Sequence, residues 1–598
     1  MRLQDKPRGL GYHPPMAEPA APALFEQLAR GWRAYALLAL IALMAALPGV
    51  GRMPVLDRDE ARFAQATRQM LETGDFVRIR VQETDRNKKP IGIHWLQAVA
   101  VSVTEPITGR NNEIWAYRVP SVLGAILATL AAFWAGTALL DRRAAFMGAA
   151  LLASCALLGG EGMIAKTDAV MTGFTTLALA ALAQLYANAS RSAERPSPPA
   201  RSPQGRGGKW IALLFWAAIG AGILIKGPVT PAVAALTLGA LALWERRFAW
   251  MKPLAWWPGP LLAALIVAPW MLAISIATGG GFFIEAIARD MAPKLAGGQE
   301  GHFGWPSYHL ILLPLLIFPA SFALPAAARL VWRSARQPRA EHDPLRFLIA
   351  WAVPTFLLFE LIPTKLIHYP LPTYPAIALL CGAALFASAR LRWRFTTIAG
   401  VALFLLGGGA WVAITAYTAT FMPGDDAADF RRALQSALIG AGILGGAAAV
   451  LALVRLPLYR TGTAVLAALA FEFMLRQHVL PEARAIHVSA EAAAALTRER
   501  LTPRDDRALW VVGYNETSLV FLTRTNVHMT SPTDAGEHAG EGEAMLIESR
   551  ALAETEAELA ARHLVFARRG APVSGFNYSN GDRVDLYVGE VAPAHAAD

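Results

Sequence analysis

Cysteine and charge are both scarce in this sequence. Only two of its 598 residues are cysteines, and Cys155 and Cys381 both lie inside apolar runs, which excludes a disulfide framework. Charged residues make up 17% of the chain and apolar residues 55%, which excludes an ordinary soluble domain. The net charge is +10, but Lys and Arg are spread over short connections and form no single basic segment, which argues against nucleic-acid binding.

In place of charge the sequence has a series of apolar runs of about 17 to 25 residues, the length that a helix needs to cross a bilayer. The pattern predicts an all-α polytopic membrane protein with about thirteen spans. The first run follows the polar segment 1–33 without a cleavage pattern, so we expect it to remain as an anchor. The expected spans are residues 34–50, 118–139, 144–160, 168–188, 210–225, 229–244, 258–277, 307–328, 347–362, 370–388, 395–416, 433–454 and 461–475.

The basic residues predict the orientation of these spans. Lys and Arg gather in alternate connections, at residues 141–143, 189–209, 245–252, 329–346, 390–394 and 455–460. The positive-inside rule places these connections and the N-terminus in the cytoplasm. An odd number of spans then puts the C-terminus outside the cytoplasmic membrane.

Several segments do not fit a bare helix bundle. The membrane domain of residues 34–475 includes two long outer loops, 51–117 and 278–306, and a cytoplasmic linker rich in Pro, Ser, Gly and Arg at 189–209. Residues 476–598 are polar enough to fold in water, as a small extracytoplasmic α/β domain. Within it we expect strands at 508–514, 563–569 and 583–591, a helix at 549–562, and a hairpin around the Asn-Gly of 575–583.

The first outer loop begins with acidic residues directly after the first span. Asp57, Asp59 and Glu60 precede an amphipathic stretch, where carboxylates commonly cap a helix and offset its dipole. Charge held close to a bilayer is costly, so a functional role competes with that structural one. Such a carboxylate could take a proton from an acceptor hydroxyl or bind a metal ion.

Isolated lysines mark the ends of several spans on the outer side, where orientation signals do not require them. Lys166, Lys226 and Lys365 each stand alone at a span end, and Lys89 precedes Pro90 in the first loop. Each alone fits an ordinary interfacial lysine. Together they predict a cationic pocket for a phosphate group.

Three further groups complete the candidate site. Asp168 opens the fourth span and is either its N-cap, a site carboxylate, or both. His368 and Tyr369 lie in a proline-rich re-entry before the tenth span, and irregular backbone at membrane depth usually lines a cavity. His302, with Glu300, could hold a divalent metal ion, the only cofactor that the residues suggest.

Taken in order, these motifs resemble a known family. The series DEARFAQATRQMLETGDF, KKPIGIHWLQ, YRVPS, KTDA, KGP, EGHFGWPSYH and TKLIHYPLPTYPA resembles that of the bacterial lipid A aminoarabinose transferases and the related protein O-mannosyltransferases, membrane glycosyltransferases of family 39/83 type with the C fold. The likeness covers about residues 34–390, and its specificity lies in the order of the motifs.

The resemblance implies an inverting transfer from a polyprenyl-phosphate sugar, such as an undecaprenyl-phosphate sugar, to lipid A, another glycolipid or a protein hydroxyl. It implies that Asp59 is the essential carboxylate with Glu60 beside it, that Lys89 contacts the phosphate, and that Asp168 is the second acidic position. Arg118 and His302 also match family positions. One departure stands out, because Lys88 replaces the acidic residue that often precedes the phosphate-contacting lysine.

Two other classes share part of this pattern. A transporter or flippase for lipid-linked sugars would have the same spans and lysines, and would add inverted repeats and interrupted helices in matching halves. A structural assembly factor would use the tail to bind a partner and would catalyse nothing. No short sequence repeat is apparent.

Overall fold

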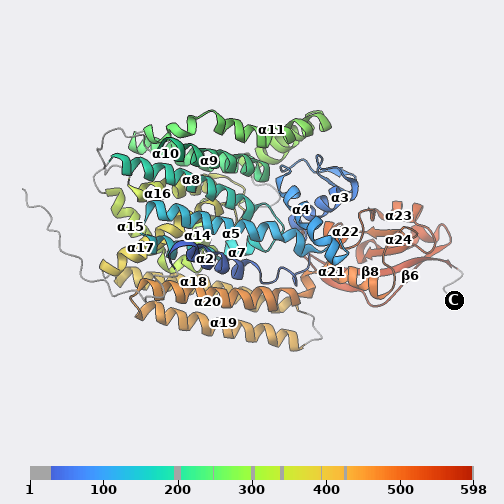
Figure 1. The fold of residues 1–598 in the computed structure, drawn as a ribbon. Helices are drawn as coiled ribbons and strands as arrows, with labels where there is room; N and C mark the ends of the chain where they lie inside the picture. The colour runs from blue at the N-terminus through green and yellow to red at the C-terminus, as the bar shows by residue number, and fades with distance from the viewer. Residues whose placement is uncertain are drawn as a thin grey trace, which may run out of the picture.

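The computed structural model describes residues 29–193, 204–246, 248–297, 303–336, 343–391, 394–422 and 427–594. Long helices lie side by side in one bundle, and a sheet-containing tail extends from one end (Figure 1). The bundle consists of α2 (Gly31–Ala46), α5 (Ile114–Leu139), α6 (Arg142–Ala153), α7 (Ala156–Gly162), α8 (Asp168–Ala193), α9 (Gln204–Lys226), α10 (Val229–Glu245), α11 (Pro258–Thr278), α14 (Tyr308–Leu316), α15 (Leu324–Arg336), α16 (Pro344–Leu361), α17 (Tyr374–Leu391), α18 (Arg394–Thr418), α19 (Ala427–Leu453) and α20 (Pro457–Met474).

The bundle confirms the expected class of a polytopic helical membrane protein. Within the described residues, eight helices are long and apolar enough to cross a membrane, two bent pairs reach that length together, and three apolar helices are shorter. Each of the thirteen expected spans coincides with one of these helices or pairs. The number of crossings stays a prediction, because the three shorter helices have no more than 17 residues.

The two bent helix pairs are each broken in the middle, and the breaks meet. The axis bends by 55° between α6 and α7 and by 113° between α14 and α15. At the first break the backbone N–H of Ala156 donates to the carbonyl of Phe318 at the second break, over 2.8 Å. Backbone groups that lose their helical partners inside a membrane protein must form other internal hydrogen bonds, and this bond satisfies one group at each break.

Small residues bring two central helices into close contact. A Cβ added at Gly124 of α5 would lie 2.6 Å from backbone atoms of Val170 in α8, and one added at Gly173 of α8 would lie 2.8 Å from the carbonyl oxygen of Gly124. Such close approach is typical of helix pairs in membranes. It fixes the N-terminal end of α8, where Asp168 lies, against α5.

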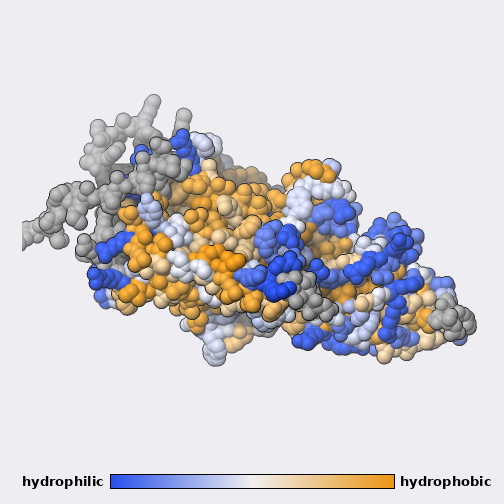
Figure 2. Space-filling view, turned by 90° about the horizontal axis from the view of Figure 1, so that it is seen from below, coloured by the Kyte–Doolittle hydropathy of each residue, from blue (hydrophilic) through white to orange (hydrophobic). Residues whose placement is uncertain are grey.

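Apolar side chains face outward on the flanks of the bundle. On α11, Leu265, Leu272 and Ile276 are all more than half exposed, and only 17% of the apolar stretch of this helix is buried. Figure 2 shows apolar residues over the bundle and hydrophilic residues over the end that carries the tail. An apolar surface of this extent fits lipid contact.

The two expected outer loops contain short elements at the tail end of the bundle (Figure 1). The first holds α3 (Asp59–Thr73), β1 (Arg80–Val81), β2 (Thr84–Asp85) and α4 (Gly92–Thr108), and the second holds α12 (Gly281–Ile284), η2 (Glu285–Met291) and α13 (Ala292–Ala296). The linker expected at 189–209 is too long at both ends, because residues 189–193 belong to α8 and residues 204–209 to α9. Residues 194–203 are outside the described part of the chain, as are residues 1–28 of the N-terminal segment.

The tail is a mixed sheet covered by helices, as the sequence predicted. Its helices are α21 (Val488–Arg498), α22 (Thr517–Leu522), α23 (Pro532–His538) and α24 (Leu552–Ala560), and its strands are β3 (Leu509–Val512), β4 (His528–Thr530), β5 (Ala544–Glu548), β6 (Leu564–Arg568), β7 (Val573–Asn577) and β8 (Asp582–Pro593). The order is β4-β3-β5-β8-β6, with β7 paired to β8. The expected hairpin is confirmed, because β7 and β8 pair antiparallel up to Asn577 and Asp582.

Candidate active site

Three of the predicted charged residues meet where α8 begins and α9 ends. Asp168 is the first residue of α8 and Lys226 is the last of α9, so the antiparallel packing of these neighbours brings the two side chains together. Lys226 donates a hydrogen bond to Asp168 Oδ1. Lys166 Nζ lies 3.8 Å from Asp168 Oδ2. Asp168 is therefore held between two ammonium groups, at a site almost closed to solvent.

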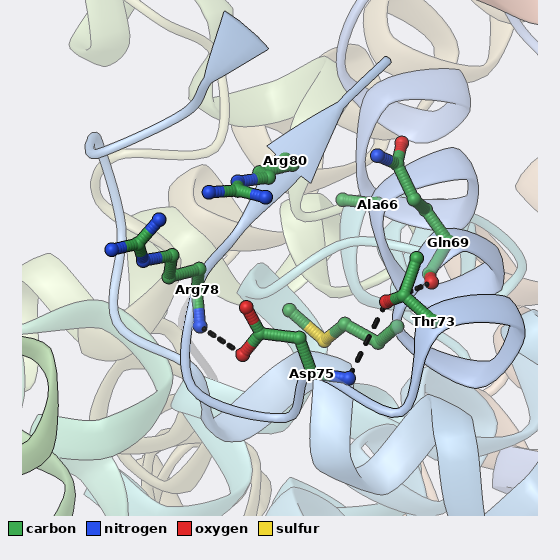
Figure 3. A pocket seen from close by; sticks show the side chains of 7 residues that line it. Ala66, Gln69, Thr73, Asp75, Arg78 and Arg80 are labelled. Atoms are coloured by element: carbon green, nitrogen blue, oxygen red, sulfur yellow. Dashed lines mark hydrogen bonds between the residues drawn. The ribbon is translucent and has the colours of Figure 1, made fainter. Parts of the chain in front are cut away.

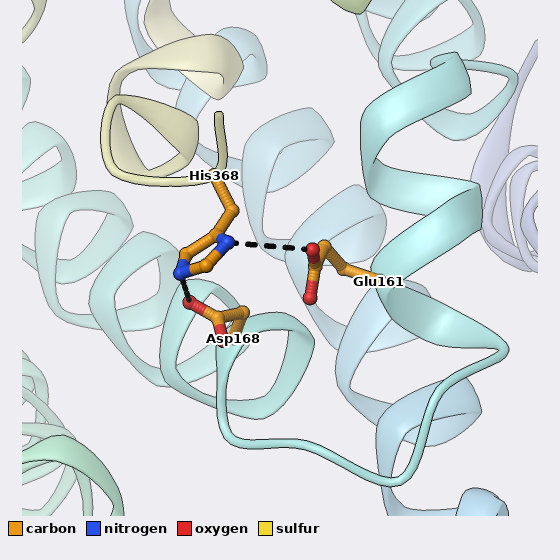
Figure 4. Close-up of side chains that lie close together, drawn as sticks. All are labelled: Glu161, Asp168 and His368. Atoms are coloured by element: carbon orange, nitrogen blue, oxygen red, sulfur yellow. Dashed lines mark ion pairs between the residues drawn. The ribbon is translucent and has the colours of Figure 1, made fainter. Parts of the chain in front are cut away.

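Glu161 and His368 extend this group. Lys166 Nζ lies 3.2 Å from Glu161 Oε2, at the end of α7. The imidazole of His368 stands between the two carboxylates, with Nδ1 3.7 Å from Glu161 Oε1 and Nε2 3.5 Å from Asp168 Oδ1 (Figure 4). Burial holds the pKa of His368 well below its usual range, so the ring is neutral at neutral pH.

Asp59 is the accessible member of the site. It is the first residue of α3, its side chain is 52% exposed, and its Oδ1 lies 3.2 Å from Arg86. Burial of its surroundings opposes ionisation, but the charges of Arg86 and Lys166 outweigh that effect and lower the pKa of Asp59. Asp59 is therefore a carboxylate at neutral pH, open to a ligand. We call Asp59, Arg86, Glu161, Lys166, Asp168, Lys226 and His368 the charge cluster.

The charge cluster is balanced without a metal ion. Glu161, Asp168 and His368 each offer an atom within 4.8 Å of the others, an arrangement that resembles a metal site. However, three carboxylates of the cluster face three cations, and two of those cations contact Asp168 directly. A divalent ion would have to compete with both ammonium groups, so the residues as placed do not fit a resident metal.

Removal of divalent metal is a direct check of this interpretation. Because lysines already neutralise the carboxylates, we expect the activity of the purified protein to be unchanged after EDTA treatment and dialysis. The measurement is the initial rate before and after chelation. Loss of activity that Mg²⁺ or Mn²⁺ restores would contradict this interpretation and show that the protein needs a divalent ion, at this cluster or at another site such as His302.

A second group of charges lies beside the cluster, in the two outer loops. Lys89 Nζ is 2.9 Å from Asp290 Oδ2, and Lys294 Nζ is 2.7 Å from the other oxygen, Oδ1. Burial lowers the pKa of Lys89, and Asp290 offsets part of that effect. Asp290 thus lies between two lysines, in a position where a phosphate group could bind the same two ammonium groups.

Arg118 and Glu60 form a buried pair with a different character. Arg118 donates to both oxygens of Glu60 over 2.8 Å, and its remaining N–H groups go to the carbonyls of Val50, Met53 and Pro54. Glu60 also accepts the backbone N–H of Ala165 over 2.7 Å. All five N–H groups of Arg118 are used, which leaves none for a phosphate and favours a role in joining the first loop to the segment before α8.

The remaining predicted residues lie at different places. Lys365 donates to the carbonyls of Phe359 and Glu360, and it is not among the residues that contact Asp168 in the described structure. Tyr369 packs beside the ring of His368, with centroids 5.5 Å apart. His302 and Glu300 are outside the described residues, so their metal assignment stays a prediction.

Four members of these groups were not predicted from the sequence. Glu161 lies at the end of an apolar run, where a lone carboxylate needs a buried partner, and that signal was available. Arg86 stands in the basic run before Lys89. Asp290 and Lys294 lie in the second loop, where nothing in the sequence indicates that they meet Lys89.

A small pocket in the first loop lies apart from these groups. Its lining residues are Ala66, Gln69, Met70, Thr73, Asp75, Arg78 and Arg80 (Figure 3). Asp75 Oδ1 accepts the backbone N–H groups of Val77 and Arg78 over 3.0 Å, and Arg80 pairs with Asp85. These contacts lie within the first loop and stabilise its conformation. None of the predicted site residues lines the pocket.

Comparison with known proteins confirms the expected resemblance. The family described as dolichyl-phosphate-mannose-protein mannosyltransferase matches residues 57–279. A protein of Erwinia tasmaniensis named undecaprenyl phosphate-alpha-4-amino-4-deoxy-L-arabinose arabinosyl transferase is 29% identical over 369 residues, which are 58% of this chain and 60% of that protein. A protein of the same name from Pseudomonas aeruginosa is 30% identical over 335 residues, 56% of each. The chain thus spans about three-fifths of the curated relatives that it matches.

Solved structures show a shared fold. The structure of ArnT from Cupriavidus metallidurans bound to undecaprenyl phosphate superposes with a TM-score of 0.69 at 18% identity, covering 93% of this chain and 97% of that one. Its apo form gives the same TM-score at 19% identity, covering 94% and 98%. The agreement covers nearly the whole of both chains and confirms the C-type glycosyltransferase fold.

Proposed function

We propose that this protein is an inverting glycosyltransferase that moves a sugar from a polyprenyl-phosphate carrier to an envelope acceptor such as lipid A or another glycolipid. The observation that carries the proposal is the charge cluster, in which an accessible carboxylate at Asp59 lies next to buried cations. The ion pair of Lys89 with Asp290 lies beside it. The names of the relatives and the undecaprenyl phosphate bound to ArnT support a carrier of this class.

We further propose that the site faces the outer side of the cytoplasmic membrane. Arg and Lys favour the cytoplasmic side in the short connections, so the N-terminus is cytoplasmic and the tail is extracytoplasmic. The first loop, the charge cluster and the tail then lie on the outer side, where a lipid-linked sugar in the outer leaflet reaches them.

The donor phosphate would bind between Lys89 and Lys294. Both ammonium groups now contact Asp290, which is a carboxylate with its pKa lowered by these lysines despite its burial. A phosphate carries at least as much negative charge and replaces Asp290 on the same two donors. Lys89 is thus the predicted phosphate-contacting residue, Lys294 joins it, and Tyr369 beside His368 stays a candidate contact.

The transfer itself forms one bond and breaks one. An acceptor oxygen attacks the anomeric carbon, the bond from that carbon to the phosphate oxygen breaks, and polyprenyl phosphate leaves with the electron pair. Negative charge grows on the leaving phosphate, and fixed ammonium groups in a partly dry site stabilise it. If the acceptor is a hydroxyl, Asp59 takes its proton, and if the acceptor is a phosphate, Asp59 orients it and no base is required.

A protein acceptor is the second candidate, because the family that matches residues 57–279 is named for protein mannosylation. A transporter is favoured less. Its class predicts interrupted helices, which α6–α7 and α14–α15 provide. However, Cys155 and Phe318 at the two breaks are fully buried, and the Phe318 carbonyl already accepts the backbone N–H of Ala156. These breaks therefore do not present open backbone groups to a transported substrate, as the broken helices of transporters do.

The test of the proposal is a product assay. Purified protein is incubated with defined polyprenyl-phosphate sugars and with lipid A or an acceptor peptide, and products are identified by mass spectrometry. We expect a mass increase of one sugar on the glycolipid from an aminoarabinose carrier. Sugar on the peptide would favour the mannosyltransferase alternative, and no product from any pair would reject a transferase.

Asp290→Asn tests the phosphate site separately from the chemistry. The change removes the carboxylate that competes for Lys89 and Lys294, so we expect undecaprenyl phosphate to bind more tightly by roughly tenfold, about 1.4 kcal/mol. The measurement is the dissociation constant in detergent. Glu285→Gln on the same short helix is the matched control, because Glu285 pairs with exposed Arg289 at 3.9 Å and with no lysine in the described part of the chain. Weaker binding by Asp290→Asn would show that Asp290 holds the site together and is not displaced.

A further inference from the structure

The tip of the tail hairpin lies against the start of α3, next to Asp59. Tyr578 and Ser579 follow β7 at this tip. The Tyr578 hydroxyl accepts the backbone N–H of Asp57 over 2.6 Å, and the carbonyl of Ser579 accepts from Arg58 over 2.8 Å. Two consecutive residues of the loop are therefore held by two consecutive residues of the hairpin.

The side chain of Asp57 is held by the tail as well. Its Oδ1 accepts a hydrogen bond from Ser518 at the start of α22 and lies 3.4 Å from the hydroxyl of Ser489 in α21. Ser489 is also bonded to the Tyr514 hydroxyl over 2.8 Å. Burial raises the pKa of Asp57 to about 6, against the effect of the Ser518 hydroxyl. A buried carboxylate whose hydrogen-bond partners in the described structure are hydroxyl groups is costly, so the contacts that hold Asp57 in place do so at the expense of stability.

The residue between Asp57 and Asp59 has a strained backbone. Arg58 has φ +65° and ψ −117°, in a region that side-chain-bearing residues rarely adopt. Such a conformation persists only where surrounding contacts impose it. Here those contacts come from both sides, the tail on Asp57 and Arg58 and helix α3 on Asp59.

We infer that the C-terminal domain positions the carboxylate of Asp59, through the contacts of Tyr578 and Ser518 with Asp57 and of Ser579 with Arg58. The inference rests on the proposed function and goes beyond it, because it assigns the tail a part in the reaction. Asp59 is half exposed, and its only charged contact within 4 Å in the described structure is Arg86. Its direction is therefore set mainly by the backbone of residues 57–59, which the tail holds.

The test compares variants of the contact residues with a matched variant of the same hairpin. Tyr578→Phe removes the hydroxyl that accepts from the Asp57 amide, and Ser518→Ala removes a hydroxyl that is bonded to Asp57 and to Ser489; we expect the tail to fold in both variants. We expect kcat to fall about 10- to 100-fold, as for a small misplacement of a reacting group, with KM for the donor unchanged. Ser518→Thr keeps a hydroxyl and should retain most of kcat. Ser574→Ala removes a hydroxyl bonded to Asp585 on the same hairpin, away from α3, and should leave kcat unchanged.

A second measurement separates this inference from the proposed function. Hydrogen–deuterium exchange at residues 57–60 should become faster in Tyr578→Phe and Ser518→Ala and stay unchanged in Ser574→Ala. If the wild type makes no product, the proposed function fails, and exchange alone decides whether the tail holds the loop. If the wild type is active and the variants keep full kcat, or lose donor binding in place of kcat, the tail does not position Asp59.

Discussion

Asp59→Asn is expected to lower kcat for a hydroxyl acceptor by about 100- to 10,000-fold, the usual contribution of a positioned acid–base group. The amide has the same shape and can still contact Arg86, but it neither accepts a proton nor carries the charge that the site holds at neutral pH. Protein yield and undecaprenyl phosphate binding should be unchanged, since Lys89 and Lys294, which bind the phosphate, are left intact.

Asp85→Asn is the matched control for this prediction. Asp85 lies in the same loop and also faces an arginine, Arg80, but outside the charge cluster. We expect it to keep the wild-type rate. Wild-type turnover by Asp59→Asn at saturating donor would remove Asp59 from the reaction.

Asp168→Asn is expected to destabilise the protein and to abolish transfer. Lys226 and Lys166 would lose a shared buried counter-charge, and breaking such a pair costs about 3–5 kcal/mol. The measurement is thermal unfolding in detergent, with product formation followed in parallel. Asp141→Asn is the control, because Asp141 caps the start of α6 and has no lysine partner in the described part of the chain, and Asn caps a helix about as well as Asp, so we expect little change in stability.

A double substitution distinguishes lost charge pairing from general damage. Adding Lys226→Met to Asp168→Asn removes the uncompensated ammonium, so the double variant should unfold at a higher temperature than Asp168→Asn alone. Transfer should stay absent, because the site carboxylate is still missing. Strictly additive destabilisation would contradict a direct interaction between the two side chains.

The spans could be read from the sequence because crossing a bilayer demands long apolar runs, and each expected run coincides with a helix or bent pair. The breaks near Cys155 and Phe318 could not be predicted, because hydropathy carries no information about backbone hydrogen bonds between distant segments. In the tail, strands β4 and β5 were missed, although β5 is fully buried; short apolar runs carry no clear period.

The candidate site was partly predictable for a related reason. Isolated charges at span ends pointed to Lys166, Asp168 and Lys226, which meet in the structure. The sequence does not say which residue of the segment 362–370 turns toward them, and His368 does so while Lys365 bonds to Glu360. The contacts of Lys89 with Asp290 and of Asp57 with the tail depend on how loops fold over one another, which local pattern does not encode.

Transfer in oriented vesicles shows whether the charge cluster acts on the side of the membrane that carries the tail. The protein is reconstituted in vesicles of known orientation, and a short-chain, water-soluble polyprenyl-phosphate sugar is supplied only on the tail side, with acceptor on the same side. We expect glycosylated acceptor from the wild type and roughly 100-fold less or lower from Asp59→Asn. Two results would contradict transfer on the tail side. One is product formed only when the donor is supplied on the side opposite the tail, and the other is transport of intact donor across the membrane.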